Sequence, residues 1–83
     1  MDRFEQVRQV LGDVLQLGER AERLRPESGL IGELPEFDSL AVVGLIAALE
    51  DEFGITIHDD DISGETFETL AALTQFVESK LAH

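Results

Sequence analysis

A serine at the start of a predicted helix is the residue best placed to do chemistry in this sequence. Ser39 follows Asp38 and precedes Leu40, where a long loop meets an apolar periodic segment. Backbone N–H groups at a helix N-terminus lack intrahelical partners, and the helix dipole favours negative charge there. A phosphodiester built on the Ser39 hydroxyl would therefore lie in a favourable field. A simpler interpretation is an ordinary helix cap, in which Asp38 or Ser39 accepts a hydrogen bond from its own helix.

Thiol chemistry would require a cofactor, because the sequence contains no cysteine. Disulfides, thiolate metal sites and a cysteine nucleophile are excluded for the same reason. A hydrolase would have to pair Ser39 with His58. Asp38 is adjacent to Ser39 and cannot easily orient a histidine that activates the same serine. The sequence therefore indicates a non-catalytic protein with no catalytic residues.

A calcium site is the alternative function. The residues at positions one, three, five and six of an EF-hand loop would be Asp59, Asp61, Ser63 and Gly64. Position twelve requires a bidentate glutamate, and the chain has Leu70 there. We therefore expect no specific metal site, although the acidic cluster could attract cations loosely.

The chain is strongly acidic, and its charge is unevenly distributed. The formal net charge is −12, and all six Lys and Arg residues lie outside the stretch from Pro26 to Ser79. That stretch holds 13 of the 18 carboxylates. Nucleic acid is excluded as a partner, because phosphate binding requires clustered cations. The charge suits either a basic protein surface, steered into contact by the field, or a solvated face that keeps the protein soluble.

The apolar periodicity predicts an all-α fold, a small bundle of three main helices plus one short helix. The first helix is capped by Asp2 and ends near Gly18, and the second runs from about Ser39 to Phe53. The last begins near Thr69. The stripes expected to be buried on the second and last helices are Val42, Leu45, Ile46, Leu49 and Phe53, and Leu70, Leu73, Phe76, Val77 and Leu81.

The segments between these helices also have predictable local structure. A short helical turn is expected over Glu19–Leu24 and another over Asp59–Ile62. The long loop of about residues 25–37 should be anchored on the core by Leu30, Ile31 and Leu34. Gly54 should supply a left-handed cap, and residues 55–57 should form an extended connector that buries Ile55 and Ile57.

The ordered set of these features resembles an acyl carrier protein. That family joins an Asp-Ser-Leu site, here Asp38-Ser39-Leu40, to a helix that ends in an acidic run, here Glu50-Asp51-Glu52. A Phe-Gly-Ile sequence and an acidic turn follow in the family, as they do here at residues 53–55 and 59–61. The resemblance covers about Leu34 to Leu81, and the first helix fits in length and spacing.

The resemblance implies a covalent cofactor and a set of partners. Ser39 would receive 4′-phosphopantetheine from coenzyme A through a phosphopantetheinyl transferase, with Asp38 and Leu40 completing the site. The arm's thiol would then carry acyl groups as thioesters to enzymes of fatty-acid, polyketide or specialised acyl-transfer pathways. Those enzymes would present basic docking patches to the second helix. The docking residues would be Leu40, Val43, Glu50 and Asp51.

Three positions depart from the common family pattern. Glu36 stands where the family often has Gly, and His58 stands where Pro is common. Gly44 replaces an acidic residue in the middle of the second helix, which removes a charge that enzymes of fatty-acid synthesis usually engage. The stretch around the Ser is also similar to specialised bacterial carriers associated with exopolysaccharide and protein-sorting loci.

The length and the hydropathy of the chain indicate how many domains it has and whether it could cross a membrane. A sequence of 83 residues predicts one domain, spanning residues 1–83. No apolar run is long enough to cross a membrane, and the first residues lack the basic start and apolar stretch of a signal peptide. We therefore expect a monomeric protein of the cytoplasm.

Overall fold

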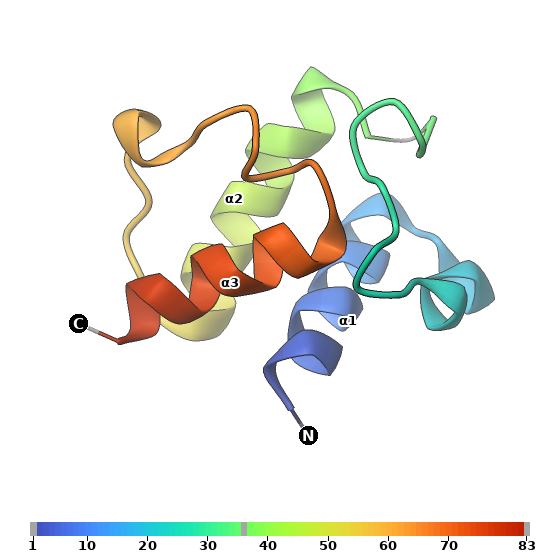
Figure 1. Ribbon diagram of the computed structural model, residues 1–83, viewed down its shortest axis with the longest axis horizontal. Helices are drawn as coiled ribbons and strands as arrows, with labels where there is room; N and C mark the ends of the chain where they lie inside the picture. The colour runs from blue at the N-terminus through green and yellow to red at the C-terminus, as the bar shows by residue number, and fades with distance from the viewer. Residues whose placement is uncertain (1, 36, 83) are drawn as a thin grey trace.

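Five helical segments follow one another in the computed structural model, which describes residues 2–35 and 37–82 (Figure 1). They are α1 (Arg3–Leu15), η1 (Gly18–Arg23), α2 (Ser39–Phe53), η2 (Asp59–Asp61) and α3 (Leu70–Leu81). Within the described residues, β pairing is limited to an isolated bridge between Gly29 and Thr69. The predicted all-α architecture is confirmed.

α1 packs against α2, α3 and η1. Its apolar stripe is buried in a core that also takes residues from α2, from α3 and from the segments that precede these two helices. The most completely buried large side chains are Val7, Leu11, Leu30, Leu45, Leu49, Leu70, Leu73 and Val77. The stripe predicted for the last helix is confirmed at Leu70, Leu73 and Val77, whereas Phe76 and Leu81 are only half-buried.

α1 begins as predicted and ends earlier than predicted. The Asp2 side chain accepts a hydrogen bond from the Glu5 N–H at 2.9 Å, so Asp2 is the N-cap. The helix ends at Leu15 because Gln16 takes a left-handed conformation with φ of 55°. This turn directs Leu17 into the core, where only 5% of its surface is exposed. The expectation that the helix continues to near Gly18 is therefore wrong, and Gly18 instead opens η1.

α2 has the predicted bounds. Leu45 and Leu49 are completely buried, while the remaining members of the predicted stripe, Val42, Ile46 and Phe53, are half-buried and pack against the core. Gly54 ends the helix with φ of 65°, a conformation that costs glycine little because it has no Cβ.

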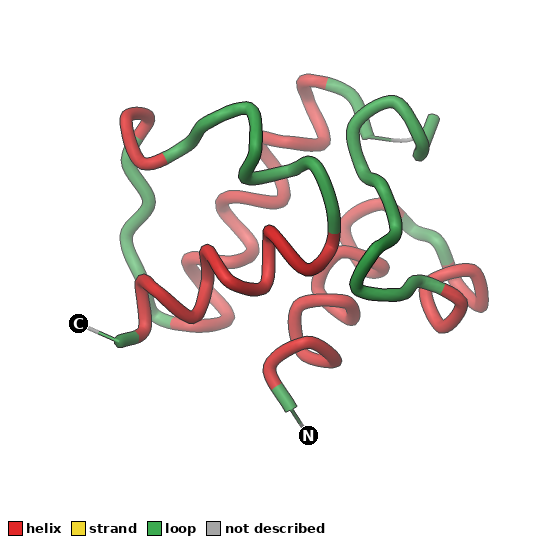
Figure 2. Tube along the Cα trace, in the orientation of Figure 1, coloured by secondary structure: helices red, strands yellow, loops and turns green. Residues whose placement is uncertain are grey.

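The long loop before α2 is held by backbone pairing with the segment before α3 (Figure 2). The Leu30 N–H donates to the Glu68 carbonyl at 3.2 Å, and the Ile31 N–H donates to the Phe67 carbonyl at 3.3 Å. Leu30 is buried and Leu34 packs against the core, as predicted. Ile31 was expected to anchor the loop as well, but its side chain is 55% exposed. The pairing orients Leu30 inward and leaves its neighbour facing solvent.

The connector after α2 is held by polar contacts at both ends. The Glu50 carboxylate accepts the Ile57 N–H at 2.7 Å. At the far end, the Lys80 ammonium contacts the Asp61 carboxylate at 2.7 Å, which ties η2 to α3. Ile55 and Ile57, which were predicted to be buried, are both half-buried, and Ile57 packs against the core.

Candidate functional site

An aromatic anchor fixes the chain just before the Asp-Ser-Leu sequence. Phe37 is 7% exposed, and its ring packs edge-to-face on that of Phe67, with 5.6 Å between centroids. The Phe37 N–H also donates to the Leu34 carbonyl at 3.0 Å. Phe67 precedes α3 and Phe37 precedes α2, so this contact positions the start of α2 against the rest of the fold. Glu36 lies outside the described residues.

The structure decides which residue caps α2. Asp38 has an extended conformation, and its Oδ1 accepts the Ala41 N–H at 2.9 Å. Its carbonyl accepts the Val42 N–H at 3.0 Å, the first hydrogen bond of the helix. Ser39 is therefore the first helical residue and is not the cap. Its side chain is exposed, and within residues 2–35 and 37–82 its hydroxyl makes no hydrogen bond. The hydroxyl is free to be modified.

The side chains next to Ser39 are apolar and face solvent. Leu40 is 81% exposed and Val43 is 65% exposed. Gly44 and Ala47 continue the same exposed face toward the C-terminus of α2. Ala47 was not among the predicted site residues, although its spacing of three from Gly44 places it on this face.

The acidic end of α2 contains two kinds of carboxylate. Asp51 and Glu52 are exposed, at about 18–20 Å from Ser39 along the helix axis. Glu50 is half-buried, and its carboxylate accepts the Ile57 N–H. Glu50 therefore has a structural contact that the sequence did not indicate, because its partner is seven residues away beyond the end of the helix.

The polar groups needed by the other two hypotheses are engaged elsewhere. A hydrolase would need Asp38 to orient a histidine, and Asp38 caps its own helix. A calcium loop would need Asp61 as a ligand, and Asp61 Oδ2 accepts from Lys80 and from the His58 N–H. Leu70, in the position of the closing glutamate, is buried in the core. Among the described residues, no group of three or more His, Asp or Glu is arranged to hold a metal.

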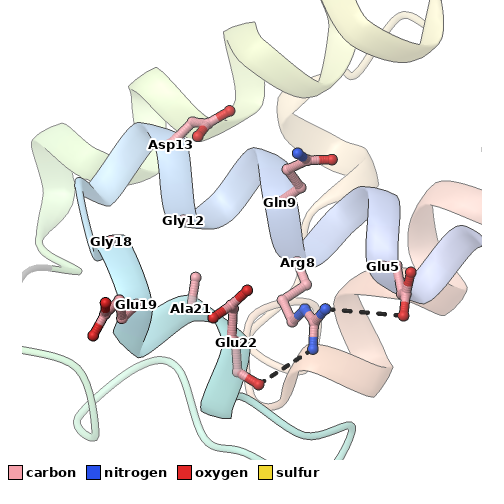
Figure 3. Close-up of a pocket in the computed structure, with 9 residues that line it drawn as sticks. All are labelled: Glu5, Arg8, Gln9, Gly12, Asp13, Gly18, Glu19, Ala21 and Glu22. Atoms are coloured by element: carbon pink, nitrogen blue, oxygen red, sulfur yellow. Dashed lines mark hydrogen bonds and ion pairs between the residues drawn. The ribbon is translucent and has the colours of Figure 1, made fainter. Parts of the chain in front are cut away.

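One surface hollow has a lining that does not include Ser39. It has a volume of about 510 Å³ and lies between α1 and η1 (Figure 3). Arg8 extends into it, near the Glu5 carboxylate at 3.9 Å and the Glu22 carbonyl at 3.4 Å. None of the residues that line the hollow belongs to α2, so it is not part of the Ser39 site.

The residues at the start of α2 fit a phosphorylated prosthetic group. The helix has 15 residues, and its first N–H groups and its dipole favour an anion on Ser39. The exposed hydroxyl leaves space for a substituent, and the exposed apolar side chains leave the approach from solvent open.

In the part of the chain that the structure describes, no helix is both long and apolar enough to cross a membrane.

Comparison with known proteins agrees with this geometry. A family profile described as "Phosphopantetheine attachment site" matches residues 5–77. Acyl carrier proteins from two strains of Nitratidesulfovibrio vulgaris are each 44% identical over 57 residues, which cover 69% of this chain and 71% of theirs. The solution NMR structure of a holo acyl carrier protein from Nitrosomonas europaea superposes with a TM-score of 0.91. It is 54% identical, and all of each chain is covered.

The chain belongs to the phosphopantetheine-attachment family and is an acyl carrier protein. Its bundle has the acyl-carrier fold, and its cofactor is 4′-phosphopantetheine. The protein is not an enzyme but a carrier, which a phosphopantetheinyl transferase modifies. Bound to the protein, the cofactor supplies the thiol that the sequence lacks.

Proposed function

We propose that Ser39 is the attachment residue of the phosphopantetheine arm. The observation that supports this proposal is that Asp38, and not Ser39, caps α2. Asp38 caps α2 at 2.9 Å from the Ala41 N–H, so the adjacent hydroxyl is exposed and takes no part in the fold. Transfer from coenzyme A forms a phosphodiester on Ser39 Oγ and releases the nucleotide part of coenzyme A. Asp38 and Leu40 complete the site, because Asp38 orders the helix start and Leu40 contacts the incoming enzyme.

The docking surface is the solvent-facing side of α2. Leu40 and Val43 provide an apolar contact beside Ser39, while Asp51 and Glu50 contribute negative charge at the other end. Exposed charges act mainly on the rate of association. The partners are therefore enzymes that combine an apolar contact with a basic patch. They are the transferase and the acyl-transferring or synthase enzymes of fatty-acid, polyketide or specialised pathways.

The remaining features of this proposal concern the whole chain. Residues 1–83 form one carrier domain, which acts as a monomer in the cytoplasm. The net charge of −12 opposes binding to nucleic acid and favours basic protein surfaces.

The test is the intact mass of the protein before and after incubation with coenzyme A and a broad-specificity phosphopantetheinyl transferase. The wild-type chain should gain the mass of one phosphopantetheine, and Ser39→Ala should gain none while keeping its helical circular dichroism. Thr69→Ala, which removes the hydroxyl that caps α3, is the matched control and should still be modified. Absence of any gain in the wild type, or a gain in Ser39→Ala, would show that Ser39 is not the attachment residue.

A further inference from the structure

The start of α3 is held by the long loop that leads to Ser39 (Figure 1). The Leu70 N–H donates to the Ser28 carbonyl at 3.0 Å, and the Ala71 N–H donates to the Pro26 carbonyl at 2.7 Å. The first N–H groups of a helix have no intrahelical partner, so the loop supplies the acceptors that the helix lacks. Together with the backbone pairing between the loop and the segment before α3, these bonds make the loop and the start of α3 one structural unit.

The Phe67 side chain links this unit to the start of α2. Phe67 is only 3% exposed, and its ring meets the Phe37 ring at 5.6 Å between centroids and 65° between planes. Aromatic rings prefer such edge-to-face contacts, and the preferred geometry restricts the position of both rings. Phe37 lies two residues before Ser39, and two residues of extended chain span at most about 7 Å. A shift of Phe37 would therefore be transmitted to Ser39, because so short a segment cannot absorb it.

The position of the Ser39 hydroxyl depends on the neighbours of Ser39. Its side chain is exposed and makes no hydrogen bond with any residue that the structure describes. In the same part of the chain, Phe37 is the buried residue nearest to it in sequence, and the next, Leu45, lies about 9 Å further along α2. The Asp38 cap determines at which residue the helix begins. Phe37 determines where that beginning lies relative to the rest of the molecule.

We propose that Phe67, acting through Phe37, is a positioning residue for the transfer of phosphopantetheine to this chain. Phe67 is buried, so it contacts neither the transferase nor coenzyme A. Its role is to hold the Ser39 hydroxyl where a docked transferase presents the phosphate of coenzyme A. A reacting atom misplaced by about 1 Å can lower a rate on the order of 100-fold, even when the substitution is remote from the chemistry. The proposal rests on attachment at Ser39.

The test is a single-turnover measurement, in which a broad-specificity transferase is in excess over the carrier and the gain of mass is followed over time. Phe67→Leu keeps an apolar residue but removes the ring that Phe37 contacts. It should lower the rate constant at saturating transferase about tenfold or more. The transferase concentration that gives half the maximal rate should change little, because the exposed face of α2 keeps its side chains. A purely structural role would lower Tm and leave the rate constant unchanged.

A matched core variant separates positioning from stability. Val77→Ala removes completely buried volume in α3, about 10 Å further along the helix than Leu70. It should lower Tm, as Phe67→Leu does, but keep the wild-type rate constant. All rates are measured below the Tm of the least stable variant. If Phe67→Leu does not fold, Phe67→Met takes its place, because the flexible methionine side chain fills irregular gaps in a core.

The double variant that combines Phe37→Leu with Phe67→Leu tests whether the two rings act through one contact. If they do, the double variant should be modified no more slowly than the slower of the two single variants. Losses that multiply would show two independent effects and would contradict the proposal.

Three further results would overturn the proposal while leaving attachment at Ser39 in place. A wild-type rate constant in Phe67→Leu would mean that the contact serves stability alone. An equal loss of rate in Val77→Ala would mean that the rate follows the stability of the whole fold. A higher half-saturating concentration with an unchanged rate constant would assign the contact to docking and not to the placement of the serine. Failure of the wild type to gain mass would instead remove both proposals.

Discussion

The Asp38 carboxylate accepts the Ala41 N–H at 2.9 Å, whereas the hydroxyl of the next residue is exposed and uncommitted. The two side chains should therefore contribute differently to stability. Asp38→Ala should reduce the free energy of unfolding by about 0.5–2 kcal/mol, the usual cost of losing an N-cap. Ser39→Ala should cost less, because alanine is tolerated at an exposed first helical position. Chemical denaturation of both variants measures the difference. A larger loss for Ser39→Ala than for Asp38→Ala would contradict this assignment of the cap.

Asp61 gives the protein a pH-dependent contact between η2 and α3. The hydrogen bond from the Lys80 ammonium, helped by the His58 N–H, holds the pKa of Asp61 below its ordinary value of 3.8. A carboxyl whose pKa is lower in the folded state stabilises the fold above the unfolded pKa. That contribution is lost as the pH falls through the folded value. The stabilisation should therefore be complete at neutral pH and absent in strong acid.

The prediction is tested by the free energy of unfolding of Asp61→Asn across pH. This variant should be modestly less stable than wild type at neutral pH, because the pair with Lys80 is 31% exposed on the Asp61 side. The difference should shrink below about pH 4, as the wild-type carboxyl is itself protonated. Asp60→Asn, exposed in the same turn, is the matched control. A difference between wild type and Asp61→Asn that is constant from neutral pH to strong acid would show that the charge of Asp61 does not stabilise the fold.

At the scale of the element, α2 has its exposed apolar side chains near its N-terminus and its exposed carboxylates in its last turn. Asp51 and Glu52 are exposed in the last turn, whereas the Glu50 carboxylate is occupied by the Ile57 N–H. The electrostatic test of docking should therefore change Asp51 and Glu52 and leave Glu50 in place. Replacing Glu50 would disturb the connector and confound recognition with stability.

Reversing both charges, with Asp51→Lys and Glu52→Lys together, should slow modification by the transferase. The effect should be on the order of tenfold at low salt and should diminish near 0.15 M salt, where the Debye length is about 8 Å. The substitutions should not unfold α2, since cations near a helix C-terminus interact favourably with the dipole. Glu5→Lys with Asp13→Lys on α1 changes the net charge equally and should have much less effect. Equal slowing by both pairs would indicate a general requirement for negative charge and no specific docking face.

At the scale of the whole molecule, the net charge of −12 acts against the compact state through self-repulsion. Added salt screens this repulsion, because the Debye length falls from about 30 Å at 0.01 M to about 8 Å at 0.15 M. The Tm measured by calorimetry should therefore rise by several degrees between these two sodium chloride concentrations. The Asp51→Lys and Glu52→Lys variant, which is less negative by four charges, should show a smaller rise. A Tm that is constant or lower in the higher salt would mean that self-repulsion does not limit stability.

Much of the fold could be predicted from local sequence signals. The bounds of α2, the caps at Asp2 and Gly54, and the two short turns follow from residues that lie within a few positions of one another. The identity of the candidate attachment residue is equally local, since it depends on the Asp38-Ser39-Leu40 order and on the apolar period that follows.

Tertiary structure decided the features that join distant parts of the chain. Leu30 and Ile31 look alike in sequence, but pairing with Glu68 and Phe67 buries the first and exposes the second. The Lys80 contact on Asp61 likewise joins residues that are 19 positions apart.

Some features of the site likewise follow from the sequence, and others depend on the folded structure. Its serine and its helix can be read from the sequence, because capping and periodicity act over one or two turns. Two features depend on hydrogen bonds and burial that form only when the chain folds: whether Asp38 or Ser39 caps the helix, and which of the acidic residues are exposed to a partner. From the sequence alone, Ser39 was as good a candidate for the cap as Asp38, and Glu50 was expected to be as exposed as Asp51. In the folded chain the Ala41 N–H lies within hydrogen-bonding distance of the Asp38 carboxylate, and the Ile57 N–H lies within hydrogen-bonding distance of the Glu50 carboxylate.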